Sequence, residues 1–168
     1  MKKLFYLFLS FGLLFSSCAE EENPFSPSSS FSCMIDGAQL NDSDPQSQII
    51  TTNPALNGAL EISATSNLPG ARVMNTVTIT IGSAQNTFKD NFLTDIDYIL
   101  GSSNSGHVWQ GTDIFATSVP NFTGTARFSK ITANKVSGTF SFEALNTDPI
   151  DASNVSVTQG SFTDVSYQ

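Results

Sequence analysis

The feature that most constrains the fold of this chain is an alternation of apolar and polar residues with a period of two. In residues 60–64, 77–81 and 136–144, every second residue is apolar or glycine and the residues between them are polar. Such alternation is typical of antiparallel strands that pack one face and expose the other. From residue 31 onward, no stretch shows the 3.6-residue period of a long amphipathic helix. The positions predicted to face inward are Leu60, Ile62, Ala64, Val77, Ile79, Ile81, Val136, Gly138, Phe140, Phe142 and Ala144.

Turn-forming residues divide the region at the spacing expected of short strands. The clearest predicted hairpin joins residues 122–132 to residues 135–144, because Asn134 tolerates the positive φ of a tight turn. In the last predicted strand, Val157 and Phe162 have opposite parity, so we expect a bulge at Gly160 that flips the buried face. The predicted turns lie at Asn57-Gly58, Pro69-Gly70, Gly82, Gly101, Gly106, Pro120-Asn121 and Ala133-Asn134.

Eight to ten short strands predict an all-β fold for residues 31–168, with a single domain. An antiparallel β-sandwich is favoured, because threonine-rich outer faces and a phenylalanine-rich inner face suit two packed sheets. A small closed or partly open β-barrel, filled by side chains, is the alternative.

The N-terminus has the pattern of an export signal. Lys2 and Lys3 precede residues 4–15, which carry no charge and are too short to span a membrane. Two serines then precede Cys18, and the run Phe15-Ser16-Ser17-Cys18 resembles the lipobox of bacterial lipoproteins, with phenylalanine where leucine is more usual. The resemblance implies that residues 1–17 are a signal peptide and that Cys18 carries lipid. A plain signal peptide with an incidental cysteine is the alternative.

Residues 18–30 have the composition of a tether, with an acidic run followed by proline and serine. Glu20, Glu21 and Glu22 follow the lipid site and resemble the export signal of surface-displayed lipoproteins in Bacteroidota. This resemblance implies an outer-membrane protein, anchored through its lipid and facing the cell exterior. A solvated stalk and a periplasmic orientation are the competing interpretations.

Charge and cysteine content narrow the classes of partner. Without Lys2 and Lys3, five basic residues remain against 15 acidic ones, which gives a formal charge of about −10. This balance disfavours nucleic-acid binding, because no basic patch is available to displace counterions from phosphates. If Cys18 carries lipid, Cys33 has no cysteine partner and no disulfide is expected. Cys33 is predicted to be a buried small apolar residue, with a reactive thiol as the alternative.

Both ends of the domain resemble a family of small Bacteroidota lipoproteins of unknown function. The resemblance lies in Phe31-x-Cys33-x-Ile35-Asp36-Gly37, in the Ser-Gly-Thr-Phe run at 137–140, and in the Gly-x-Phe run at 160–162. It leaves residues 40–120 poorly matched. The resemblance implies strand cores and turns, and it brings no activity or catalytic residue with it.

The sequence offers little support for catalysis or a cofactor. His107 is the only histidine, and no spacing of zinc ligands or Gly-x-Ser-x-Gly elbow occurs. Residues 41–44 and the pair Asp95 and Asp97 could supply calcium ligands, but neither has the register of a calcium loop. We therefore expect a solvated turn, a strand edge and no metal or other cofactor. A glycosidase pair among the 15 acids cannot be assigned by spacing.

Residues 101–111 have the most unusual composition, since they hold the only tryptophan and the only histidine between glycine- and serine-rich flanks. One interpretation is a loop on which Trp109, with His107, stacks a sugar. The other is a hairpin whose Trp109 covers the core. The predicted function is thus binding of a glycan or an envelope protein by a non-enzymatic β-domain. A structural or assembly lipoprotein without a small ligand, and a carboxylate-dependent hydrolase, are the alternatives.

Overall fold

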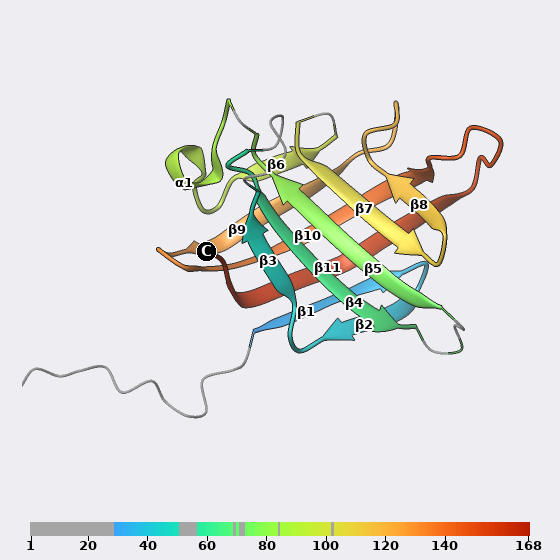
Figure 1. The fold of residues 1–168 in the computed structure, drawn as a ribbon, viewed down its shortest axis with the longest axis horizontal. Helices are drawn as coiled ribbons and strands as arrows, with labels where there is room; N and C mark the ends of the chain where they lie inside the picture. The colour runs from blue at the N-terminus through green and yellow to red at the C-terminus, as the bar shows by residue number, and fades with distance from the viewer. Residues whose placement is uncertain (1–28, 51–56, 69, 71–72, 84, 102) are drawn as a thin grey trace, which may run out of the picture.

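The computed structural model describes residues 29–50, 57–68, 70, 73–83, 85–101 and 103–168 (Figure 1). Cys18 and the acidic run Glu20, Glu21 and Glu22 lie outside the described residues. Within the described ranges the fold is all-β, as predicted, and forms one domain. Its one helical turn, α1 (Phe88–Asn91), has neither the length nor the hydrophobicity that crossing a membrane requires.

In the described part of the chain, eleven antiparallel strands form one sheet, slightly more than the eight to ten that the turn spacing predicts. The strands are β1 (Ser30–Ile35), β2 (Ala38–Asp42), β3 (Gln46–Ile49), β4 (Leu60–Asn67), β5 (Met74–Ile81), β6 (Asp97–Leu100), β7 (Ser105–Gln110), β8 (Asp113–Ala116), β9 (Gly124–Ile131), β10 (Lys135–Asn146) and β11 (Asn154–Ser166).

The sheet folds over at β10 into two layers. One layer has the order β2-β1-β11-β10-β9-β6 and the other has the order β8-β7-β5-β4-β3. Strand β10 belongs to both, because Val136–Phe142 pairs with β9 while Leu145 and Asn146 pair with β8. Figure 1 shows the green and yellow strands β4, β5 and β7 running across the orange and red strands β10 and β11. This arrangement is that of a sandwich, or partly open barrel, continuous along one side.

Isolated hydrogen bonds join the layers at the edges of this open sheet. The Asp42 carboxylate, at the end of β2, accepts the N–H of Thr65 on β4 at 2.9 Å. On β3, the N–H of Ile49 donates to the carbonyl of Gln168 at 3.3 Å. Because free strand edges invite pairing with other chains, these contacts protect two of the edges.

The space between the layers is filled mainly by phenylalanine and branched aliphatic side chains. Phe128 has no exposed surface, and its ring centroid lies 5.2, 5.8 and 5.7 Å from those of Phe88, Tyr98 and Phe162. All eleven positions predicted to face inward are buried. The hairpin between β9 and β10 is also confirmed, with its turn at residues 132–134.

Cys33 is buried and free, in agreement with its prediction as a small apolar residue. Burial raises the pKa of its thiol to about 12, because the thiolate would lose its hydration among apolar neighbours. The thiol is therefore protonated and unreactive at neutral pH.

One predicted turn position, Gly106, needs correction, and one predicted bulge is confirmed. Gly106 lies inside β7, not in a turn, and a Cβ there would lie 2.8 Å from the ring of Phe142. The bulge expected near Gly160 is confirmed: the pairing register with β10 shifts between Val157 and Gly160, Gln159 has a positive φ of 51°, and both Val157 and Phe162 are buried. Gly160 itself is buried, and a Cβ there would lie 2.6 Å from the ring of Phe140. Both glycines thus accommodate an aromatic ring, of Phe142 and of Phe140.

Candidate ligand-binding sites

His107 and Trp109 lie on β7, which forms a hairpin with β8, so the hairpin interpretation of this segment is confirmed and the loop interpretation is wrong. The indole, however, lies on the outer face of the strand and does not cover the core. Because alternate residues of a strand point to opposite sides, both side chains face away from the core that Val108 enters. Both are half-buried. Their ring centroids are 5.5 Å apart with an interplanar angle of 36°. The strand holds this aromatic pair in one place, with part of each ring open to solvent.

Neighbouring strands surround the pair with hydroxyl and aliphatic groups. Trp109 lies opposite Thr76 on β5 and opposite Ile114 on β8, while His107 lies opposite Thr78. Thr78 is only 5% exposed although its side chain is on the outer side of the sheet, where it lies between Ser63 on β4 and His107 on β7. We call the surface formed by Thr76, Thr78, His107, Trp109 and Ile114 the β7 face.

The imidazole of the β7 face is uncharged at neutral pH. Burial lowers the pKa of His107, and the negative charge of Glu61 opposes that shift only in part. A neutral imidazole offers one N–H donor and one nitrogen acceptor. In the described part of the chain, His107 makes no hydrogen bond to a serine or a carboxylate. It can thus exchange hydrogen bonds with a hydroxyl-bearing ligand, but it is not arranged as the base of a nucleophilic pair.

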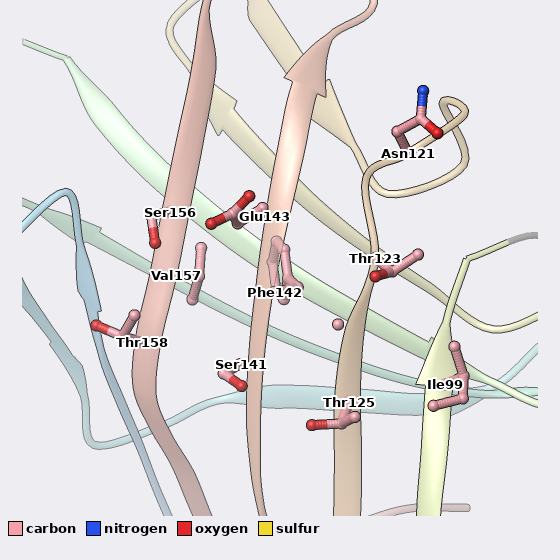
Figure 2. A pocket seen from close by; sticks show the side chains of 11 residues that line it. Ile99, Asn121, Thr123, Thr125, Ser141, Phe142, Glu143, Ser156, Val157 and Thr158 are labelled. Carbon is pink, nitrogen blue, oxygen red and sulfur yellow. The ribbon is translucent and has the colours of Figure 1, made fainter.

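A second site is a hollow on the outer side of the other layer, across β6, β9, β10 and β11 (Figure 2). Its volume is about 430 Å³, within the range of roughly 300–1,000 Å³ common for small-ligand pockets. We call it the outer hollow. It is lined by Ile99, Asn121, Thr123, Gly124, Thr125, Ser141, Phe142, Glu143, Ser156, Val157 and Thr158.

The predicted acidic clusters have structural roles. Besides the N–H of Thr65, Asp42 accepts the N–H of Asp44 at 2.9 Å, which forms the turn expected at residues 41–44. Asp95 and Asp97 lie 3.7 and 3.3 Å from Arg127, at the start of the edge strand β6. Within the described ranges, no three histidine, cysteine or acidic side chains come together as a metal site.

Comparison of the chain with protein-family models, with curated proteins and with solved structures found no match. The resemblance of the two ends to small lipoproteins therefore stays a prediction.

The outer hollow is the site that sequence reasoning missed. Its polar residues come from separate segments, and each looks like an ordinary outward residue of a strand or turn. The one available signal is the short length of the outward residues Thr125, Ser141 and Ser156 on three strands. Only the order of those strands in the sheet, β9-β10-β11, puts the short residues side by side.

Proposed function

We propose that this protein is a lipid-anchored outer-membrane lipoprotein whose exterior-facing β-domain binds a glycan at the β7 face without catalysing a reaction. The anchor in this proposal is Cys18, supported by the lipobox-like run before it. Orientation toward the exterior is supported by the acidic run Glu20, Glu21 and Glu22.

The observation that carries the proposal is the position of Trp109. The only indole of the chain lies on the outer face of a central strand, partly open and flanked by Thr76, Ile114 and His107. Sites on strands are more precisely held than sites on loops. Stacking on such a ring requires no tuned pKa, and the analogous stacking of nucleobases contributes about 1–3 kcal/mol per contact. The neighbouring hydroxyl and imidazole groups can exchange hydrogen bonds with sugar hydroxyls.

The absence of catalysis in this proposal is supported by the surroundings of the ionisable groups. A general acid–base pair needs two groups within hydrogen-bond reach of one substrate. Asp95 and Asp97 are instead paired with Arg127, and Asp164 is paired with Lys130 at 2.9 Å.

A glycan array probed with the purified protein tests the proposal. We expect the wild type to bind at least one class of glycan, and Trp109→Ala to lose most of that binding. His107→Ala should weaken binding less, because it removes hydrogen bonds but not the stacking surface. Thr163→Ala is the matched control, since Thr163 is exposed on the opposite layer. A silent array, or a Trp109→Ala variant that binds every glycan as tightly as the wild type, contradicts the proposal.

A second candidate function, docking of an envelope protein, is favoured by exposed apolar residues around β6. Leu93, Ile96 and Ile99 are 61%, 45% and 59% exposed and lie within seven residues of chain. Strand β6 pairs only with β9 and so forms an edge of the sheet. Replacing Leu93 with serine should reduce crosslinking of the protein to its envelope partner and leave the glycan array unchanged, because Leu93 does not line the outer hollow.

A further inference from the structure

The outer hollow is formed by short side chains on adjacent strands. Gly124 at the start of β9 lies opposite Phe142 on β10, next to Ser141, while Ser156 lies on the other side of β10, on β11, opposite Glu143. Figure 2 shows these strands with the polar side chains around the hollow. A Cβ on Gly124 would lie 2.2 Å from both the Ser141 carbonyl oxygen and the Phe142 Cβ. Glycine is therefore required for β9 to lie this close to β10.

The chemistry of the lining suits a ligand with many hydroxyl groups. Apart from one carboxylate, the polar lining consists of five serine or threonine hydroxyls and one amide. Each hydroxyl both donates and accepts, and the Asn121 amide does the same through two different atoms. Ile99, 59% exposed, provides an apolar wall for the carbon–hydrogen face of a ring.

Charge sets a further restriction on the ligand. Glu143 is the only ionisable residue of the lining, and in the described part of the chain it has no ion-pair partner. The nearest cation along β9, Arg127, is held by Asp95 and Asp97. An anionic ligand would therefore meet an uncompensated negative charge, whereas an ammonium group would be attracted to it. The two oxygens of the carboxylate can also accept hydrogen bonds from two adjacent sugar hydroxyls.

We propose that the outer hollow is a second sugar-binding site, separate from the β7 face, that accepts neutral or amine-bearing sugars and rejects acidic ones. It lies on the outer side of the layer opposite β7, so both sites can be occupied at once. A protein with two such faces would crosslink glycan chains.

Three monosaccharides of matched ring structure test the proposal: glucosamine, glucose and glucuronate. Each is titrated into the ¹⁵N-labelled full chain in detergent micelles, and binding is followed by nuclear magnetic resonance. The backbone amides of Gly124 and Ser141 report on the outer hollow. The indole N–H of Trp109, the only one in the chain, reports on the β7 face.

We expect saturable shifts at Gly124 and Ser141, with glucosamine binding at least about fivefold tighter than glucuronate and glucose between them. Glu143→Gln should bring the three affinities within about twofold of one another. Ser141→Ile, which fills the hollow with a strand-favouring side chain, should abolish these shifts. Trp109→Ala should leave them unchanged, so failure of the β7 face and failure of the outer hollow are distinguishable.

Two kinds of result would overturn the proposal. One is the absence of shifts at Gly124 and Ser141 with all three sugars up to their solubility limits. The other is binding in which glucuronate equals or exceeds glucosamine, or in which Glu143→Gln changes nothing. Dispersed amide spectra for Glu143→Gln and Ser141→Ile, matching the wild type away from the hollow, establish that both variants are folded.

Discussion

Gly106→Ala tests how the two layers pack between the two proposed sites. Gly106 is buried in β7 and faces Phe142, which forms part of the floor of the outer hollow. Its N–H donates to the Thr117 hydroxyl at 3.0 Å, and its carbonyl accepts the Thr117 N–H at 3.1 Å, so the backbone is fixed on that side. A Cβ at this position would lie 2.8 Å from the Phe142 ring, closer than side-chain carbons approach one another.

The expected cost follows from two opposing effects. Overpacking a core by one methyl group costs about 1–3 kcal/mol. Replacing glycine by alanine recovers about 0.4–1 kcal/mol through the reduced entropy of the unfolded chain. With about 2 kcal/mol for the first effect and about 0.7 kcal/mol for the second, the middle of each range, we expect Gly106→Ala to lower the free energy of unfolding by about 1.3 kcal/mol. At the urea m-values of small domains, this lowers the denaturation midpoint by about 0.5–1 M.

Urea unfolding followed by circular dichroism measures this change, and Gly101→Ala is the matched control. Gly101 is in the same segment, has no atom within 4 Å of its added Cβ, and is not in the left-handed region. Its substitution should leave the midpoint unchanged or raise it. In the double variant with Phe142→Leu, the effect of Gly106→Ala should shrink, because the smaller side chain relieves the clash. Equal midpoints for Gly106→Ala and the wild type would refute this account of the packing.

Four further predictions concern His107, Cys33, Cys18 and the acidic run at residues 20–22. Because burial lowers the pKa of His107, the unfolded chain binds this proton more readily, so its contribution to stability is present above the ordinary pKa of about 6.5 and is lost as the pH falls below it. Urea midpoints between about pH 5 and 7 should therefore depend less on pH in His107→Gln, and an identical dependence would contradict this assignment. Cys33, whose pKa is raised to about 12, should resist iodoacetamide at pH 8 in the folded protein and react in guanidinium, as read by peptide mass spectrometry; labelling in the folded protein would count against its burial. A palmitate analogue fed to cells should label the wild type and not Cys18→Ala, and equal labelling of both would exclude lipid at that residue. Replacing Glu20, Glu21 and Glu22 with alanine should keep the lipid but reduce protease access on whole cells; unchanged access would leave the acidic run as a solvated stalk.

Local sequence patterns predict which residues are buried wherever the environment of a residue depends only on its own strand. Leu60, Ile62 and Ala64 are buried as expected, because the period of two places them on one face whatever the partner strand. Gly106 is different. Glycine is required there because any side chain would clash with the ring of Phe142, which lies 36 residues further along the chain. Nothing near Gly106 in the sequence separates such a glycine from one in a turn.

The sequence singles out the residues of the candidate site on β7, but it does not predict the face of the sheet on which they lie. Trp109 and His107 stand out by composition, and their segment forms the hairpin that is one of its two sequence interpretations. That Trp109 faces outward, between β5 and β8, could not be predicted, because the face of a strand that is buried depends on the strands it pairs with. The outer hollow lies beyond such reasoning, because the neighbours of Ser141 are set by strand order and not by sequence distance.

The central claim, that a glycan stacks on Trp109, is tested most directly by the fluorescence of that residue, since the chain has no other tryptophan. The protein is titrated with linear tetrasaccharides of glucose, xylose, mannose and N-acetylglucosamine, with acrylamide quenching measured at each step. We predict that at least one of them shifts the emission saturably and shields the indole from acrylamide, and that His107→Ala weakens this effect. If none changes the emission, or if one binds while the indole stays equally open to acrylamide, the β7 face is not the glycan site.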